Sequence, residues 1–594
     1  MRYQSRKDCL PEQTIQKIRE ILYSAGLFPY EMDWTMHVKN CHALRLGLDG
    51  FPGKGVNGKG VTKSYALASA YGEMMERIQC GMMFKRQYGL MSETFLKYPG
   101  AKAVDANKLI SNYGDILSTM LKVKIYELEH VFSGLELSCF PYYHVNSESV
   151  VYLPESLINM TIGSNGMCAG NNASEAIVQG LSEIMERYVS KKMIDDHYEF
   201  PDIPVKDIDN SILIEMIKDV ENKGYKLIIK DFTLGGKFPC LGVILMDCRN
   251  MKYTISLGAH PVFDIALQRC ITEVFQTSKI HHKMLSFLSL FDSRSKLNAD
   301  ESKDSLDINQ SIIGAYVGNL SIFETNCESD LYKNAFLKNP ESNDISLKFM
   351  LNRLKEMGFE IFIRDASYLG FPAYRIYVNG MSEMYQQSLE ELKDAFHSEK
   401  SLKRYMLRIK QLSKEELGEL AERIEDMSAD SGFLAQDLYN ACQVIFEQGS
   451  DFQYLLNEFD YFMTLLYCSI GNYTKAYFHL KKYIDIRGDR IQNITYFTCV
   501  LHYLKLHNEG KQKNLNEILI PIYGQTAKKV IEDMSEPEKI FEVYDLPNCG
   551  DCSICSYNGK CSYLSWTQYT QKMQDKIDSF PFGEERLSAF LQKI

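Results

Sequence analysis

Two segments of the chain are near copies of each other, and each places carboxylates on an otherwise apolar helix. GEMMER covers residues 72–77 and SEIMER covers residues 182–187. In the first helix Ser69, Glu73 and Glu76 stand at positions i, i+4 and i+7, so they share one face. Carboxylates among alanine, leucine and methionine side chains cost free energy unless a positive charge meets them. The pattern predicts either an exposed stripe with local ion pairs or a site that holds a cation.

The second helix gathers its carboxylates in the same way. Glu183 and Glu186 stand at i and i+3, and Glu175 lies about 20° around the helix axis from Glu186 at 100° per residue. Asn172 or Ser174 is the expected N-cap, because both side chains accept hydrogen bonds from backbone N–H groups. This helix therefore also presents a carboxylate-bearing side.

A third helix, ALQRCITEVFQ, places Arg269, Glu273 and Gln276 at i, i+4 and i+7. Facing carboxylates repel one another unless a cation lies between them, and magnesium prefers oxygen ligands that it shares with substrate phosphates. Arg187 and Arg269 suit phosphate oxygens. We therefore expect the three helices to converge on a magnesium–nucleotide site. Three unrelated surface helices are the alternative.

The composition excludes several functions. The chain has 594 residues, and its 66 Lys+Arg against 77 Asp+Glu give a formal net charge of −11. An acidic chain lacks the basic face that general nucleic-acid binding needs, so no direct nucleic-acid contact is expected. No segment approaches the roughly 18 uninterrupted apolar residues of a membrane span, and the N-terminus lacks the apolar stretch of a signal peptide. We expect a cytoplasmic protein without membrane contact.

The chain divides into three regions of different character. Residues 1–395 alternate helical and strand patterns, which predicts an α+β domain. Residues 396–535 are almost wholly helical in period, and residues 536–594 form a cysteine-rich tail. The expected elements of the first region are a helix over 1–27, a strand over 42–48, a glycine-rich loop over 50–60, a helix over 64–83, strands within 120–160, a loop over 164–172 that opens a helix to 193, two strands over 227–236 and 239–247, a helix over 264–280, a polar surface loop over 292–310, and strands over 361–366 and 373–380.

The helical region contains one segment that resembles a tetratricopeptide-type helix pair, Leu465–Ile484. Gly471 and Tyr473 are expected in its turn, and Ala476 at the helix crossing. A generic helical bundle is the alternative.

The glycine-rich loop is not a P-loop. Gly53 to Lys59 fits G-x-x-x-x-G-K, but Gly60 follows where serine or threonine should hold the metal. A glycine loop can still bring backbone N–H groups to a phosphate.

Three long blocks resemble the signature blocks of the YcaO family. They are NGKGVTKSYALASAYGEMMER, SNGMCAGNNASEAIVQGLSEIMERY and LGAHPVFDIALQRCITEVFQ, and the resemblance covers most of residues 1–395 in the correct order. The chain is most similar to stand-alone bacterial members with a C-terminal tetratricopeptide-like domain. That type is linked to methylthiolation of an aspartate in a small-subunit ribosomal protein, as an accessory to a radical methylthiotransferase.

The resemblance implies ATP and magnesium as cofactors and a role for each signature residue, and it names no catalytic side chain. The implied magnesium ligands are Glu73, Glu76, Glu183, Glu186 and Glu273. The implied ATP contacts are Lys7, Thr14, Ser69, Glu73, Cys168, Asn171, Glu175, Arg187, Arg269 and Glu273. The family phosphorylates a backbone amide oxygen of a protein or peptide, which turns a poor leaving group into a good one.

Two other functions remain open at this stage. One is a thioamide- or azoline-forming enzyme of peptide natural-product synthesis, although azoline-forming members usually end in a proline-rich tail and this chain ends FLQKI. The other is an adaptor in which bound ATP only sets the conformation. The sequence leaves the substrate, the nucleophile and the oligomeric state open, a homodimer included.

Four cysteines are clustered near the C-terminus, at positions 549, 552, 555 and 561. The spacing of Cys549, Cys552, Cys555 and Cys561 suits zinc or an iron–sulfur cluster, and a disulfide framework is not expected in a cytosolic chain. We expect a structural metal clip that fixes the C-terminus.

Overall fold

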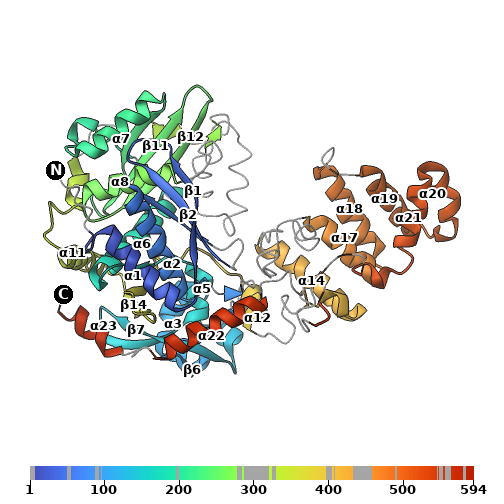
Figure 1. Cartoon of the computed structure of the whole chain (residues 1–594). Helices are drawn as coiled ribbons and strands as arrows, with labels where there is room; N and C mark the ends of the chain where they lie inside the picture. Colours follow the sequence, from blue (N-terminus) through green and yellow to red (C-terminus); the bar gives the residue numbers. More distant parts are fainter. Residues whose placement is uncertain are drawn as a thin grey trace. The chain divides into compact units, whose positions relative to one another are not determined.

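The structure, a computed structural model, forms two compact units (Figure 1). The first unit comprises residues 1–85, 94–387 and 565–594, and the second comprises residues 86–93 and 388–564. The residues described are 7–49, 55–83, 85–86, 93–94, 96–195, 200–276, 284–286, 320–323, 330–396, 405–406, 408–431, 458–487, 491, 493–542, 544, 546, 553–555, 563–579 and 584–593.

Helix α1 begins later than the sequence pattern predicts. It spans Pro11–Ser24, and the described residues 7–10 before it are not helical. Pro11 explains this start, because a proline ring disfavours helical backbone at the preceding residue while it suits the first helical position. Gly26 follows the helix with φ +76°, in agreement with its expected role as the stop.

The glycine-rich segment is a strand where it is described, and not the loop that was predicted. β3 (Gly55–Gly60) pairs with β2 (His42–Leu48), which has the predicted bounds. A Cβ atom on Gly58 or Gly60 would lie 2.1 Å or 2.5 Å from backbone atoms of Ala66. The glycines therefore let β3 lie directly against helix α2 (Lys63–Gln79), which Thr62 caps and which ends four residues before the predicted end at residue 83.

All paired strands of the first unit are antiparallel, as the α+β prediction allows. A three-stranded sheet has the order β1-β2-β3, a four-stranded sheet the order β10-β11-β12-β13, and a six-stranded sheet the order β6-β7-β14-β15-β9 with β8 beside β7. The remaining bounds are β1 Pro29–Met36, β6 Lys102–Asp105, β7 Glu136–His144, β8 Ser149–Pro154, β9 Met167–Ala169, β10 Lys226–Asp231, β11 Cys240–Asp247, β12 Lys252–Ala259, β13 Leu285–Ser286, β14 Ile361–Asp365 and β15 Ala373–Val378, with the short pair β4 Lys85–Arg86 and β5 Glu93–Thr94.

The strand prediction for residues 120–160 is only partly correct. β7 and β8 lie there, but α4 (Ile125–Phe132) and α5 (Glu155–Ile162) are helices. Both helices have only eight residues, so the hydrophobic pattern of each is too short to distinguish helix from strand. Packing of α4 on α3, and of α5 on β7 and β8, decided their conformation. The other helices of this unit are α3 Ala106–Leu121, α7 Ser211–Asn222, α8 Phe263–Val274 and α11 Asn343–Glu356. The polar loop expected over residues 292–310 lies outside the described residues.

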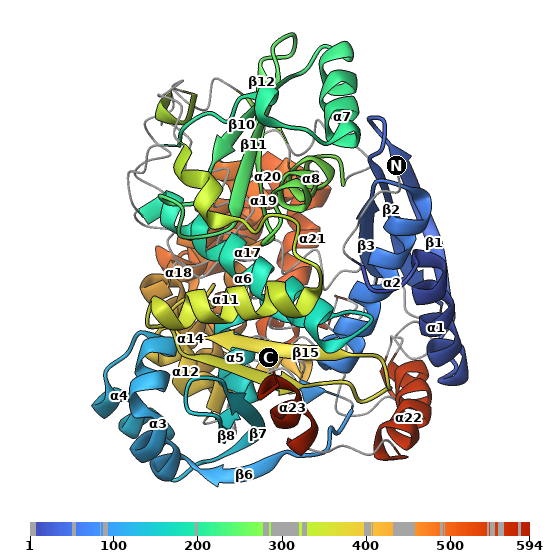
Figure 2. The ribbon, with the colours of Figure 1, turned by 90° about the vertical axis from the view of Figure 1, so that its left-hand side faces the viewer.

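Helix α6 (Ala173–Asp195) occupies the centre of the first unit (Figure 2). It packs against β9 and β15 of the six-stranded sheet and against β12 of the four-stranded sheet. Its buried Ile177, Ile184 and Met185 belong to one apolar core with residues of both sheets. A helix enclosed in this way holds its side chains in fixed positions.

The second unit is helical where it is described, as predicted. Its helices are α12 Leu389–Phe396, α14 Lys414–Ser431, α17 Phe459–Ile470, α18 Tyr473–Arg487, α19 Ile494–Asn508, α20 Leu515–Tyr523 and α21 Gln525–Asp533. Helices α17 and α18 form the expected pair, with Gly471 at φ +81° between them and Ala476 fully buried. Tyr473 begins α18 and does not lie in the turn. Membership in the tetratricopeptide class stays a prediction.

The C-terminal helices α22 (Tyr563–Ser579) and α23 (Glu584–Leu591) belong to the first unit. Lys576 donates to Ser24 Oγ at 2.5 Å, and Leu587 and Leu591 are buried in the apolar core that contains α6. Cys549, Cys552 and Cys561 lie outside the described residues, and Cys555 is half-buried. Among the helices described, none is long and apolar enough to cross a membrane.

Candidate active site

Helix α2 presents two carboxylates to a single guanidinium group. Arg77 lies 3.4 Å from Glu73 Oε1 and 3.5 Å from Glu76 Oε1. The Glu76 side chain is only 11% exposed and that of Arg77 is 19% exposed. One positive charge therefore serves two half-buried or buried carboxylates on the apolar helix that the sequence predicted.

Helix α6 brings a second pair. Arg187 Nε donates to Glu183 Oε1 at 3.1 Å, and the backbone N–H of Ala259, at the end of β12, donates to Glu186 Oε2 at 3.2 Å. Burial lowers the pKa of Arg187, but Glu183 and Glu186 outweigh it, so the pKa is raised overall. Glu183 is thus held by its own helix, and Glu186 by the end of β12.

The two pairs share one electrostatic environment. Burial raises the pKa of Glu76 well above its usual range, Arg77 opposes the rise, and the negative charges of Glu183 and Glu73 add to it. Burial likewise raises the pKa of Glu73, with Arg77 opposing and Glu183 contributing. Residues about 110 positions apart therefore repel each other through space, as carboxylates do when they face a common centre.

Carboxylates outnumber the arginines that pair with them at this centre. Arg77 and Arg187 are ion-paired with glutamates of the group Glu73, Glu76, Glu183 and Glu186, while Lys59 acts electrostatically on Glu73 and Arg375 on Glu76. A divalent cation with oxygen ligands suits such a cluster, and magnesium is the usual choice beside phosphates. Within the described ranges, no three His, Cys, Asp or Glu side chains meet at metal-binding distance. The arginines hold the carboxylates instead, so coordination needs these side chains to turn inward.

A hydrogen-bond network joins the N-terminus to the start of α6. Lys7 Nζ lies 3.2 Å from Glu175 Oε1, and Asn171 Nδ2 donates to the same carboxylate at 3.0 and 3.1 Å. Thr14 on α1 donates to Asn171 Oδ1 at 2.7 Å, and Asn172 caps α6 by accepting from Glu175 N. Although burial acts to raise it, Lys7 and hydrogen bonds lower the pKa of Glu175 overall. Four of the implied ATP contacts thus meet in one cluster.

The third helix, α8, joins the site through two contacts. Arg269 donates to Gln179 Oε1 of α6 at 3.0 Å, and Glu273 forms an ion pair with Lys59 of β3. Lys59 also acts electrostatically on Glu73 of α2. Lys59 was not among the site residues predicted from the sequence, although it belongs to the segment that was compared with the P-loop. The sequence feature that could have indicated it is a lysine between two glycines, Gly58 and Gly60, which permit close packing.

Two implied contacts differ from the rest in placement. Ser69 is exposed on α2, and its implied contact with ATP stays a prediction. Cys168 is fully buried, and its thiol donates to Tyr374 O at 3.5 Å. Burial raises the pKa of this thiol well above its usual range. Its implied contact with ATP therefore stays a prediction, because the residue has no exposed surface in this structure.

These features define a mixed helix-and-sheet protein with a carboxylate-rich centre between three helices. Residues 57–382 match the family described as YcaO cyclodehydratase, ATP- and Mg2+-binding. The match covers more than half of the chain, and the chain belongs to the YcaO family.

Two curated relatives share similar identity with the chain. One is the ribosomal protein S12 methylthiotransferase accessory factor YcaO of Escherichia coli, 29% identical over 399 residues, and the other is an uncharacterized protein of Haemophilus influenzae, 29% identical over 394 residues. Each match covers 64% of this chain and 66% of the relative. A solved structure of YcaO from Methanopyrus kandleri bound with AMPPCP and Mg2+ is 16% identical, with a TM-score of 0.41 over 63% of this chain and 92% of that one.

Proposed function

We infer that this chain uses ATP and magnesium to activate a backbone amide of a protein or peptide, as an accessory factor in the methylthiolation of a small-subunit ribosomal protein. The observation that carries the inference is the cluster of four carboxylates on α2 and α6, which share only two ion-paired arginines. Membership in an ATP- and Mg2+-binding family supports the cofactors, and the E. coli relative supports the biological setting. The cytoplasmic location, the radical methylthiotransferase partner and the ribosomal protein substrate belong to the same proposal.

Each side chain has a part in this proposal. Glu73, Glu76, Glu183, Glu186 and Glu273 would hold magnesium, since they supply only oxygen ligands. With Glu73 and Glu76 as metal ligands, Arg77 would remain as the positive charge beside them. Arg187, released from Glu183, and Arg269 would orient phosphate oxygens. ATP supplies the phosphoryl group that activates the amide oxygen.

The cluster at the N-terminus would position the nucleotide. Lys7, Thr14, Asn171 and Glu175 are already hydrogen-bonded to one another, so little conformational entropy is lost when they bind a ligand. Lys59 supplies a further cation beside Glu273, and magnesium would have to displace it from that carboxylate. The chain thus carries its own cations at positions that a metal ion would take.

The test is release of ADP that depends on a protein substrate. Purified protein with ATP and magnesium should release ADP in proportion to modified amide when the ribosomal protein and the methylthiotransferase are added. ATP binding without substrate-dependent ADP release would favour the adaptor function. Mass spectrometry of ribosomal proteins and small peptides from a deletion strain separates the remaining candidates: loss of a thioamide or azoline from a short peptide would favour the natural-product enzyme.

The metal clip at Cys549, Cys552, Cys555 and Cys561 is a separate part of the proposal. Its support is the spacing alone, since thiolates this close together suit a metal ion. Protein purified without oxygen should contain about one zinc per chain, or about four irons with visible colour if the site is an iron–sulfur cluster. Traces of both metals, with four readily alkylated thiols, would refute the clip.

A further inference from the structure

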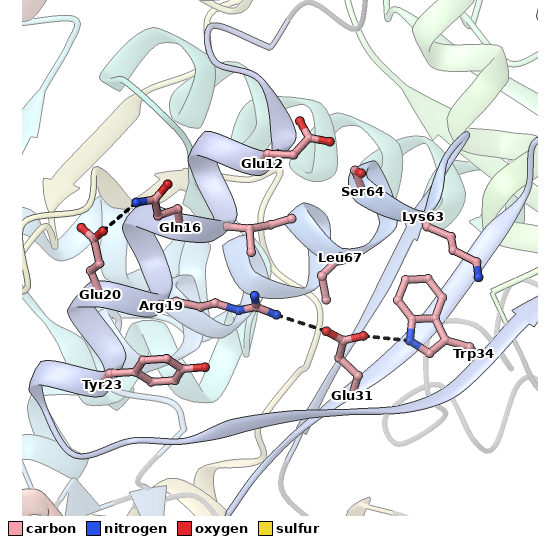
Figure 3. A pocket seen from close by; sticks show the side chains of 11 residues that line it. Glu12, Gln16, Arg19, Glu20, Tyr23, Glu31, Trp34, Lys63, Ser64 and Leu67 are labelled. Atoms are coloured by element: carbon pink, nitrogen blue, oxygen red, sulfur yellow. Dashed lines mark hydrogen bonds and ion pairs between the residues drawn. The ribbon is translucent and has the colours of Figure 1, made fainter.

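A groove of about 720 Å3 lies on the first unit (Figure 3). Its walls are helix α1, the first turn of α2 and strand β1. Helix α1 contributes residues 12, 15, 16, 19, 20 and 23, which recur at helical spacing along one side. The same helix turns Thr14 toward Asn171, so the groove and the proposed nucleotide site use different sides of α1.

The lining of the groove is partly apolar and partly polar. Ile15 and Leu67 are apolar lining residues, and the indole of Trp34 belongs to the β1 wall (Figure 3). Arg19 donates to Glu31 at 3.2 Å and to Tyr71 Oη at 2.7 Å, so its charge is already engaged. Trp34 Nε1 donates to Glu31 at 3.0 Å, which fixes the indole with one face toward the groove.

The charge of the lining is negative. Glu12, Glu20 and Glu31 face Arg19 and Lys63, a sum of 2 − 3 = −1. Lys63 Nζ lies 5.9 Å from the centre of the Trp34 ring, so the chain's own ammonium group already lies over this indole. The groove therefore suits a cationic side chain with an apolar stem.

The backbone beside the groove is an open sheet edge. β1 is the outer strand of the order β1-β2-β3, and among the described strands it pairs only with β2. Large apolar side chains are exposed near it: Phe28, Tyr30 and Met36 are 51%, 43% and 58% exposed. An edge strand with exposed apolar side chains is a site where an extended polypeptide adds as a further strand.

We propose that this groove binds an extended, basic segment of a partner polypeptide, which adds to the free edge of β1 and places lysine or arginine side chains beside Glu12, Glu20 and Glu31. The apolar stems of these side chains lie on Ile15 and Leu67. Backbone pairing supplies affinity, and the carboxylates select the basic side chain. Binding here does not depend on ATP.

The chain allows a direct measurement, because it has only two tryptophans. In the full-length Trp566→Phe variant, Trp34 is the only indole that reports. Titration with a capped decapeptide of alternating threonine and lysine, without nucleotide, should change its fluorescence in a saturable way. The same peptide with glutamate in place of lysine should not bind, and raising salt from about 50 to 300 mM should weaken binding.

Two changes separate the charge from the backbone contribution. Glu12→Gln with Glu20→Gln should weaken binding about threefold or more, because exposed ion pairs are individually weak. Glu129→Gln on α4, also an exposed helical glutamate, is the matched control and should leave binding unchanged. A lysine peptide with alternate backbone nitrogens methylated should bind at least about tenfold more weakly, since it cannot pair with β1.

Several results would overturn the proposal. They are equal binding of the lysine and glutamate peptides, equal binding of the double variant and wild type, and equal binding of the methylated peptide. A fluorescence change that follows protein concentration alone, with dimers in sedimentation, would assign the groove to a second copy of the chain. None of these results bears on ATP binding, so failure here is distinguishable from failure of the proposed amide activation.

Discussion

Replacement of Glu76 by glutamine removes one carboxylate from the glutamate centre and preserves the shape of helix α2. Gln and Glu have similar helix propensity, and Arg77 keeps Glu73 as its partner at 3.4 Å. The variant therefore tests whether these carboxylates hold a divalent ion.

The expected magnitude follows from the charges. A divalent ion about 4 Å from one carboxylate gains about 8 kcal/mol at an effective dielectric constant of 20. Most of this gain is offset by the desolvation of both ions. We therefore expect the affinity for ATP at saturating magnesium to fall at least about tenfold, a loss of about 1.4 kcal/mol.

Stability without magnesium should move in the opposite direction. The pKa of Glu76 is raised by burial, with Glu183 and Glu73 adding to the rise, so its ionised form destabilises the folded protein. Glu76→Gln should therefore be at least as stable as wild type at pH 7.5 in the presence of a chelator. A merely structural glutamate would show the reverse, because its loss would destabilise the fold.

Isothermal titration calorimetry gives the affinity, and urea unfolding gives the stability. Glu129→Gln on α4 is the control and should match wild type in both. Wild-type ATP affinity in Glu76→Gln, or a clear loss of stability in the chelator, would refute the assignment of this centre to magnesium.

Three further predictions follow from the same geometry. Because burial raises the pKa of Glu73 and Glu76, the folded protein holds protons more tightly than the unfolded chain. Its free energy of unfolding in chelator should therefore fall as pH rises from about 4.3 through the raised pKa values. Urea unfolding at pH 5 and pH 8 measures this fall. An equal fall in the Glu73→Gln/Glu76→Gln double variant would contradict the prediction. Lys59→Gln should tighten binding of magnesium alone by about tenfold in calorimetry, because the ammonium group competes for Glu273. The control is Lys63→Gln, because Lys63 lies over Trp34 and is not paired with Glu273; this variant should bind magnesium as wild type does. Equal magnesium affinities in the two variants would exclude competition between Lys59 and the metal ion for Glu273. Excision of residues 388–564 with a flexible linker should leave ATP affinity within about threefold. A second variant that also lacks residues 565–594 should have a lower melting temperature, because burial of Leu587 and Leu591 is worth about 1.5–3 kcal/mol for each side chain. If the variant that lacks only residues 388–564 is folded but does not bind nucleotide, the second unit is needed to complete the site.

Part of the candidate site follows from local spacing alone. The carboxylates of α2 and α6 were predicted on single helix faces because 3.6 residues per turn places i, i+3 and i+4 together whatever surrounds the helix. The cap at Asn172 and the stop at Gly26 followed for the same reason, since both depend on the backbone of adjacent residues. The assignment of these residues to ATP and magnesium remains a prediction.

The tertiary structure decided which charges meet. The pairs Lys7–Glu175 and Lys59–Glu273 join residues that no sequence period relates, and only the packing of α6 and α8 against the sheets brings them together. The same holds for β3. Its glycines predicted a loop from the sequence, but in the folded chain they form a strand because α2 packs too closely on β3 to leave room for side chains. Helical and turn preferences act over a few residues and can be read in order along the chain. Coulomb and packing forces act across space, so the sequence determined the carboxylate faces and the folded chain determined their partners.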